Sequence, residues 1–368
     1  MGLVRTFLRL GYEVVAIAPE DEYSQQLVLE GCRYYPIKME NKGTNPLQDL
    51  LLTKRFYDTY RRVKPDVILQ YTIKPNIYGS LAAKLAGIPT INNVSGLGTV
   101  FLVRNMVSKV ALKLYKLAFR FPEKVFFQNK EDRQLFLEHH LINERITDVL
   151  PGSGIDTERF KPAQDFTRNK NFTFLMVARV LYEKGVVEYV EAARIIRAQY
   201  PEVRCQLLGG IDESGNIGIK RAIFESWVAE GAIEYLGTSG TVEAHITEAD
   251  CVVLPSYREG TPKTLLEAAA MGKPIVTTNV PGCRETVIEG WNGFLCEVKD
   301  AADLADKMIR MYCLPEGELA SMGKASRKLA EEKFDERYVI EKYLSAVRAI
   351  TKGETALNPQ NVKPFYSA

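Results

Sequence analysis

Short β-rich segments alternate with helical patterns along the first 150 residues. Short β-rich runs typical of strands lie at residues 12–18, 66–70, 90–94 and 124–128. Amphipathic patterns at 47–63 and 77–86 predict helices between these runs. Residues 1–11 have the pattern of the end of an amphipathic helix, and neither a strand nor a Gly-rich turn precedes them. We therefore expect the first strand of this domain to be missing.

The second half repeats the same order. Its predicted strands lie at residues 172–177, 204–208, 232–236, 251–254 and 274–277, with helices such as 187–199 and 241–249 between them. Alternating strands and helices predict an α/β protein whose parallel sheets are covered on both faces, and two series predict two Rossmann-like domains. Ligands of such sheets bind beyond the carboxyl ends of the strands, so we expect the site in a cleft between the domains.

The expected domain boundary lies in the Gly- and Pro-rich segment 150–162. The predicted divisions are an N-terminal domain at 1–152, a C-terminal domain at 153–334, a helix at 335–352 and a tail at 353–368. The tail is polar and Pro-bearing, and we expect it to be poorly ordered unless something holds it.

Composition indicates a soluble globular protein. The 368 residues are 46% hydrophobic and 26% charged, with a net charge of +2. Residues 1–150 hold 21 basic and 15 acidic side chains, and this excess favours an anionic partner of the first half. No apolar run has the roughly 20 residues of a membrane span. The six cysteines show no zinc spacing and predict buried thiols in a reducing compartment, so a cytoplasmic protein is expected.

The stretch SYREGTPKTLLEAAAMGKP, residues 256–274, joins a predicted strand to a predicted helix. Thr261 is expected to be the N-cap, Pro262 the first helical residue and Gly272 the end of the helix. The free backbone N–H groups of the first turn would carry the positive end of the helix dipole, which predicts a diphosphate site. These N–H groups belong to Lys263, Thr264 and Leu265.

Two glutamates flank this phosphate site. Glu259 precedes the helix, and Glu267 lies about 7.5 Å beyond Pro262 along the helix axis. Carboxylates accept hydrogen bonds from vicinal diols, so Glu267 is expected on a ribose and Glu259 on a transferred sugar. The alternative is that Glu267 is a solvated helix residue and Glu259 a partner of the helix dipole.

Two cations follow the strand predicted at 172–177. Arg179 comes just after this strand, and the turn RVLYEKG brings Lys184 to the start of the next helix. Fixed positive charge at this sheet edge would stabilise a leaving diphosphate. Surface cations without a ligand are the alternative.

Four motifs carry a family resemblance. They are R-x4-K-G at 179–185, E-G-x-P-x4-E at 259–267, PGCRETV at 281–287 and WNGFL at 291–295. Together they resemble glycosyltransferase family 4, whose members are retaining enzymes of the GT-B fold. The resemblance covers roughly residues 8–350. It implies Arg179 and Lys184 on the diphosphate of a sugar nucleotide, with Glu259 on the donor sugar and Glu267 on the ribose. The implied donor site also includes Gly260, Thr261, Lys263, Thr264, Leu265 and Gly237.

Residues 71–98 resemble a narrower bacterial branch that extends undecaprenyl-diphosphate-linked sugars in capsule, O-antigen or N-glycan assembly. The resemblance implies a UDP-sugar donor, often a UDP-N-acetylhexosamine, and a polyprenyl-diphosphate-linked acceptor near Lys74, Ser95 and Gly96. No cofactor, metal or nucleic acid is expected, and the chain contains no D-x-D sequence. Many members of the family carry a histidine near the position of Ser95, whereas the histidines here are His139, His140 and His245. No catalytic histidine is assigned.

Residues 104–124 predict a basic amphipathic helix. Its basic face comprises Lys109, Lys113, Lys116 and Arg120. An adjoining apolar stripe comprises Val110, Leu114, Leu117 and Phe121. Such a helix can lie on the anionic inner face of the cell membrane, which predicts a peripheral protein. The alternative, in which the stripe packs on the domain core and the lysines face water, is about as well supported by sequence.

Two other function classes remain open at this stage. A GT-B sugar-nucleotide epimerase would also bind a UDP-sugar, but the scarcity of histidine and the basic helix disfavour it. A non-catalytic sugar-nucleotide-binding protein would fit the missing first strand and the missing histidine.

Overall fold

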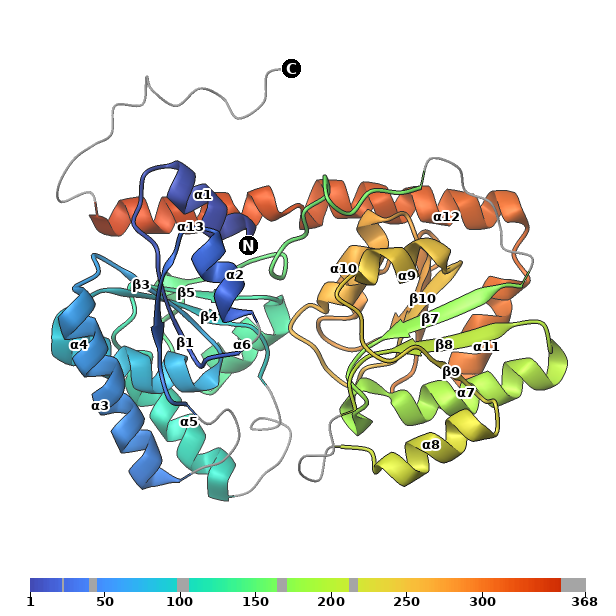
Figure 1. Ribbon diagram of the computed structural model, residues 1–368, viewed down its shortest axis with the longest axis horizontal. Helices are drawn as coiled ribbons and strands as arrows, with labels where there is room; N and C mark the ends of the chain where they lie inside the picture. The colour runs from blue at the N-terminus through green and yellow to red at the C-terminus, as the bar shows by residue number, and fades with distance from the viewer. Residues whose placement is uncertain (22, 40–44, 98–105, 164–170, 212–217, 352–368) are drawn as a thin grey trace, which may run out of the picture.

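The computed structural model describes residues 1–21, 23–39, 45–97, 106–163, 171–211 and 218–351, with the backbone alone at 106–108. Two α/β domains lie side by side, and a long helical segment runs along both of them (Figure 1). The described sheets are all parallel. The predicted α/β class with two domains is therefore confirmed.

The second domain is built on a six-stranded sheet with the order β12-β11-β10-β7-β8-β9. The strands are β7 (Thr173–Val177), β8 (Arg204–Leu208), β9 (Glu234–Tyr235), β10 (Cys251–Leu254), β11 (Ile275–Thr278) and β12 (Gly293–Cys296). Every residue of β10 and β11 is buried, because helices cover the sheet. The helices are α7 (Val186–Gln199), α8 (Arg221–Ala229), α9 (Val242–Glu248), α10 (Lys263–Ala270), α11 (Ala301–Tyr312) and α12 (Glu316–Leu329).

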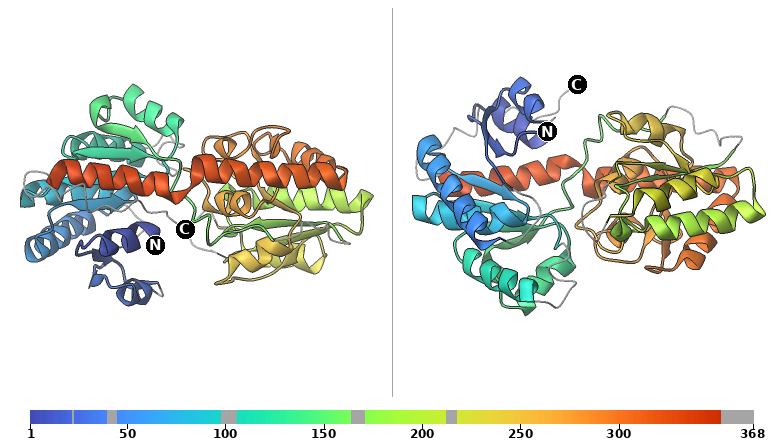
Figure 2. Two further views of the ribbon diagram at one scale, coloured as in Figure 1. Left: turned by 90° about the horizontal axis from the view of Figure 1, so that it is seen from above. Right: turned by 60° about the horizontal axis from the view of Figure 1, so that its bottom comes forward.

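The first domain contains two sheets where a single sheet is usual for a Rossmann-like domain. A four-stranded sheet holds β3 (Ile68–Tyr71), β4 (Thr90–Val94), β5 (Lys124–Phe127) and β6 (Thr147–Val149) in that order, and β1 (Val15–Ala18) pairs separately with β2 (Arg33–Pro36). Within the described ranges no ladder joins the pair to the larger sheet. Figure 2 shows the pair and its helices standing beside the rest of the domain.

The helices of the first domain are α1 (Gly2–Arg9), α2 (Ser24–Leu29), α3 (Pro46–Val63), α4 (Ser80–Ala86), α5 (Met106–Ala118) and α6 (Lys130–Glu138). The helix predicted at 77–86 begins earlier, with a π-helical turn, η1 (Pro75–Gly79), that leads into α4. A proline suits this start, because its missing N–H would have no partner in a first helical turn. The sequence patterns did not predict strands β2 and β6.

Helix α13 (Glu336–Thr351) returns from the second domain and packs on the first. It buries Val339, Tyr343 and Val347 against a cluster that includes Phe7 and Phe126. The end of α12 leads into it through a π-helical turn, η7 (Ala330–Phe334). The first domain thus gains part of its core from the end of the chain.

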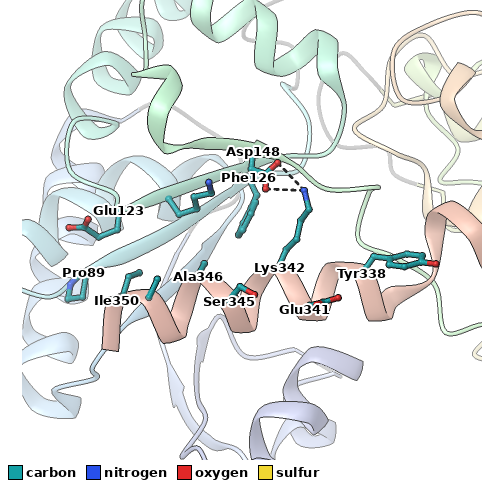
Figure 3. A pocket seen from close by; sticks show the side chains of 12 residues that line it. Pro89, Glu123, Phe126, Asp148, Tyr338, Glu341, Lys342, Ser345, Ala346 and Ile350 are labelled. Carbon is teal, nitrogen blue, oxygen red and sulfur yellow. Dashed lines mark hydrogen bonds and ion pairs between the residues drawn. The ribbon is translucent and has the colours of Figure 1, made fainter. Parts of the chain in front are cut away.

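A cavity of about 960 Å³ lies between α13 and the four-stranded sheet. Lys342 of α13 forms an ion pair with Asp148 of β6 at 2.9 Å beside this cavity (Figure 3). None of the predicted site residues lines it. The cysteines are all free thiols; five are buried, whereas Cys313 is exposed, which corrects the expectation for that residue.

Replacing Tyr343 with Phe should destabilise the packing of α13. The Tyr343 hydroxyl accepts a hydrogen bond from Nδ2 of buried Asn93 at 2.7 Å, so its removal leaves that donor without its partner. We expect the free energy of unfolding to fall by about 1–3 kcal/mol, measured by denaturant titration. Tyr338→Phe, at an exposed position of the same helix, is the control. Equal stability of the two variants would contradict this role of the hydroxyl.

Candidate active site

The loop between β10 and α10 carries the first of the two predicted glutamates. The Glu259 carboxylate accepts a hydrogen bond from Ser256 Oγ at 2.6 Å and forms an ion pair with Lys184 Nζ. The side chains of Lys184 and Glu259 are 19% and 16% exposed. The structure therefore brings together two of the three residues that were predicted to be catalytic.

Lys184 reaches this loop because of the glycine that follows it. Lys184 ends a 3₁₀ turn, η4 (Tyr182–Lys184), and Gly185 has a φ of +72°. A Cβ atom at Gly185 would overlap the carbonyl oxygen of Pro255, so a side chain there would push the turn away from the loop. Arg179, the third predicted catalytic residue, is exposed just after β7, the strand next to β10.

Helix α10 begins one residue later than the sequence predicted. Pro262 is the N-cap and Lys263 the first helical residue. The Thr261 hydroxyl does not cap the helix; it donates to the carbonyl oxygen of Gln128, in the first domain, at 3.1 Å and to that of Gly260 at 2.9 Å. The prediction of Thr261 as N-cap is therefore wrong, because a distant backbone acceptor takes its hydroxyl.

The first turn of α10 presents fewer free amides than predicted. The amide of Leu265 donates to the carbonyl oxygen of Pro262 at 3.0 Å, so that N–H group is not free. The amides of Lys263 and Thr264 make no backbone hydrogen bond to any described residue. These two N–H groups remain suitable donors to an anion at the positive end of the helix.

Glu267 lies on the next turn of α10 and is 8% exposed. The alternative of a solvated glutamate is thus ruled out. Burial raises the pKa of Glu267, while Lys263 Nζ, 3.5 Å away and well exposed, opposes that shift. Thr264 Oγ1 donates to the carbonyl oxygen of Val177 at 3.1 Å and ties the helix start to the end of β7.

Ser95 and Gly96 of the first domain meet the same loop. A Cβ atom at Gly260 would overlap the carbonyl oxygen of Ser95, and a Cβ atom at Gly96 would lie 3.4 Å from the Gly260 amide nitrogen. The absence of a side chain at Gly260 permits this approach of two backbones. The structure therefore places two residues predicted for the acceptor against the loop predicted for the donor.

Two other predicted residues have more ordinary surroundings. Lys74 Nζ forms an ion pair with Asp49 at 3.1 Å, and Asp49 also accepts from the Tyr78 hydroxyl at 2.7 Å. The charge of Lys74 is thus already compensated within the first domain. Gly237 has a φ of +73°, and no atom would lie within 4 Å of a Cβ there. Its left-handed backbone conformation, and not a lack of space, therefore favours glycine at this position.

Three residues of this region were missed by sequence reasoning. Asp132 has a fully buried side chain and accepts from Arg258 Nη2 at 2.5 Å, and Asn129 Nδ2 donates to the Gly260 carbonyl oxygen at 2.8 Å. The N-x-x-D spacing was a signal for the start of a helix. No local pattern marks Arg258, 126 positions away, as the partner of Asp132.

The remaining motifs support the loop and the sheet. A Cβ atom at Gly282, in PGCRETV, would overlap the Glu259 carbonyl oxygen, and the Glu259 amide donates to the Pro281 carbonyl oxygen at 3.2 Å. In WNGFL, buried Asn292 Nδ2 donates to the Thr286 carbonyl oxygen at 3.1 Å just before β12. His139 and His140 are exposed at the end of α6, and His245 lies on α9. The described residues hold no group of three or more His, Cys, Asp or Glu side chains that could bind a metal ion.

Comparison with known proteins agrees with this architecture. Residues 157–329 match the family described as "Glycosyl transferases group 1", and residues 2–129 match "Glycosyl transferase 4-like". The chain is 31% identical over 359 residues to the N,N'-diacetylbacillosaminyl-diphospho-undecaprenol alpha-1,3-N-acetylgalactosaminyltransferase of Campylobacter jejuni, covering 92% of each chain. It is 25% identical over 276 residues to the UDP-Gal:alpha-D-GlcNAc-diphosphoundecaprenol alpha-1,3-galactosyltransferase of Escherichia coli, covering 72% of this chain and 71% of that protein.

Solved structures share the fold. A glycosyltransferase from Rickettsia africae superposes with a TM-score of 0.78 at 20% identity, covering 96% of this chain and 94% of that one. Anabaena HepE in complex with UDP-glucose gives a TM-score of 0.77 at 19% identity, covering 94% of each chain. The two α/β domains and the returning helix are thus those of the GT-B fold, and the chain belongs to the group 1 glycosyltransferases.

Proposed function

We propose that this glycosyltransferase moves a sugar, with retention of configuration, from a UDP-sugar to a saccharide linked to polyprenyl diphosphate. The observation that carries the proposal is the contact of the Glu259 loop with Lys184 on one side and with Ser95 and Gly96 of the first domain on the other. The relatives from C. jejuni and E. coli are named for substrates linked to undecaprenyl diphosphate, which supports this class of acceptor.

In this proposal UDP leaves against fixed positive charge. Arg179 and Lys184 lie at the carboxyl edge of the second sheet. The amides of Lys263 and Thr264, at the N-terminus of α10, make no backbone hydrogen bond to any described residue. Such preorganised donors stabilise developing negative charge without having to reorient, so we propose that transfer needs neither a metal nor another cofactor. The transferred sugar is an N-acetylhexosamine, by analogy with the C. jejuni relative, and galactose is the alternative that the E. coli relative supports.

Glu259 has one carboxylate oxygen committed and one available. Ser256 and Lys184 both donate to Oε1, and Oε2 makes no hydrogen bond within the described ranges. We assign Oε2 to a hydroxyl of the donor sugar. The acceptor hydroxyl then attacks the anomeric carbon on the face from which UDP departs. A double displacement through Glu259 is the alternative, and trapping a sugar on this residue would distinguish the two.

Helix α5 supports an approach to the inner face of the cell membrane. Lys109, Lys113, Lys116 and Arg120 are exposed. Val110 and Leu117 are also exposed, at 53% and 44%, whereas Tyr115 and Ala118 face the core. The alternative in which the whole predicted stripe packs on the core is therefore wrong for Val110 and Leu117. No helix among the described residues is long and apolar enough to cross a membrane.

Helix α3 adds apolar surface to the same domain. Leu47, Leu50 and Leu51 on its first turns are each more than half exposed. Both α3 and α5 contact η1, because Asp49 of α3 accepts a hydrogen bond from Tyr78 of η1, and Tyr115 of α5 belongs to the same buried cluster as Ile77 of η1. Leucines at this spacing share one helix face and can enter the lipid boundary, while the basic side chains meet anionic headgroups.

Replacing Glu259 with Ala should slow transfer without abolishing UDP binding. We expect UDP release in the presence of a polyprenyl-diphosphate-linked saccharide to fall roughly 100-fold or more, because the donor sugar loses its carboxylate partner. The UDP dissociation constant should change by no more than about threefold. Glu191→Gln, on the exposed face of α7, should retain the wild-type rate. Transfer at the wild-type rate by the Glu259→Ala variant would refute the assignment.

The same assay separates the other function classes. UDP release that requires the saccharide and continues in EDTA supports the proposal. An isomerised UDP-sugar formed without acceptor indicates an epimerase. UDP-sugar binding without any turnover indicates a non-catalytic protein.

The affinity for UDP should fall as the pH is lowered. The fall should begin at a higher pH than the one at which an ordinary glutamate takes up a proton. Burial raises the pKa of Glu267, so its carboxylate takes up a proton earlier on acidification and becomes a weaker, neutral acceptor for a ribose hydroxyl. Titration calorimetry at a series of pH values from near neutrality down to the ordinary glutamate pKa of about 4.3 measures the change. Glu267→Gln should bind weakly at every pH and lose this dependence. A variant that keeps the wild-type pH profile would show that another group is responsible.

Replacing Lys113 and Lys116 together with Gln should weaken binding to vesicles. At about 1 kcal/mol for each basic residue, we expect roughly 30-fold weaker partitioning onto vesicles that contain phosphatidylglycerol, measured by co-sedimentation. Lys324→Gln with Lys328→Gln, on exposed positions of α12, should bind like the wild type. Equal effects of the two pairs would show that binding is nonspecific and would count against an α5 surface.

A further inference from the structure

We infer that Arg258, Asp132 and Asn129 form a positioning contact, in which the first domain holds the Glu259 loop of the second domain in its transfer-competent place. The contact itself is independent of the substrate, while its effect on turnover rests on the proposed function. These side chains act through the loop, so they position Glu259 and do not touch the reacting atoms.

The ion pair at the centre of this contact is buried. The Asp132 side chain has no exposed surface, and Arg258, which is 21% exposed, donates to it at 2.5 Å. Burial raises the pKa of Asp132, and the hydrogen bond from Arg258 opposes that shift. A carboxylate in such a place requires a partner, and here the other domain supplies the partner from the residue next to Glu259.

Asn129 adds a second link to the backbone of the loop. Its Nδ2 donates to the Gly260 carbonyl oxygen at 2.8 Å and lies 3.4 Å from that of Glu259. The Thr261 hydroxyl bond to Gln128 continues this line of contacts. Three consecutive loop residues are thus bonded to the segment that leads from β5 into α6, the helix on the side of the first domain that faces the second (Figure 1).

Capping of α6 does not by itself account for these residues. Asn129 Oδ1 accepts from the Asp132 amide at 2.7 Å, and Asn129 Nδ2 donates to Asp132 Oδ2 at 3.1 Å, which completes a capping pair within the first domain. A cap of this kind functions equally well in water at a helix end. The bond from Arg258 and the bond to Gly260 are additional, and both come from the second domain.

The other side of the loop is held by its own domain. The amide of Tyr257 donates to the Glu183 carbonyl oxygen at 2.9 Å, and that of Glu259 donates to the Pro281 carbonyl oxygen at 3.2 Å. The loop is therefore clamped from both domains. Loss of the first-domain side should let the loop fluctuate and move Glu259 relative to Lys184, although the groups assigned to UDP remain intact.

Hydrogen exchange of the full-length chain tests this inference without any substrate. In Arg258→Met and in Asp132→Asn, the amides of residues 256–261 should exchange about tenfold faster or more, as measured by mass spectrometry. Arg133→Met is the matched control. Arg133 neighbours Asp132 on α6 but pairs with Glu144, at 2.9 Å, inside the first domain, so its removal should leave exchange of the loop unchanged.

Turnover and binding provide a second readout in the same variants. The kcat for transfer should fall about tenfold or more while the UDP dissociation constant stays within about threefold, a split that general destabilisation would not produce. The double variant should be no worse than the more impaired single variant, because the two side chains act as one unit. Circular dichroism verifies that each variant is folded.

The outcomes separate this inference from the proposed function. Unchanged loop exchange in both single variants overturns the positioning contact, whatever their activity. Faster loop exchange in Arg133→Met to the same extent also overturns it. A wild-type protein that transfers no sugar refutes the proposed function, and the exchange rates still decide the contact.

Discussion

The candidate active site depends on the close approach of two backbones at Gly260. The carbonyl oxygen of Ser95 occupies the space that a Cβ atom would need there, so the two domains can meet only where the loop has no side chain. Gly185 and Gly282 permit similar approaches by the η4 turn and by the PGCRETV segment. Three glycines thus define where Glu259 lies, and its ion pair and hydrogen bonds follow from that placement.

Electrostatic compensation distinguishes the two glutamates of the loop and helix. Glu259 has two donors, Lys184 and Ser256, at a single carboxylate oxygen, which leaves its other oxygen available. Burial raises the pKa of Glu267, and the exposed Lys263 that pairs with it only partly opposes this shift. The same residue type thus occupies two environments that differ in burial and in the donors around the carboxylate.

Sequence patterns predicted those elements that carry a strong local signal. Strands β4, β8 and β10 were predicted with the bounds that the structure has. Strand β10 is a continuous buried apolar run, whereas β4 is buried throughout and β8 is buried after its first residue. Strand β2 (Arg33–Pro36) was missed because its residues are exposed or half-buried and lack an apolar pattern. Strand β9 is only two residues long, and its neighbours in the predicted run lie outside the ladder.

The sequence alone determined the α/β class, the family and the choice of Glu259, Arg179 and Lys184, because turn chemistry and residue type are local properties that motifs record. Tertiary structure decided which groups meet. The Thr261 hydroxyl bonds to Gln128 and not to its own helix, Lys74 is paired with Asp49, and Asp132 meets an arginine from the other domain. Contacts between residues far apart in the chain depend on how the sheets and domains pack, and one-dimensional spacing carries no record of that packing.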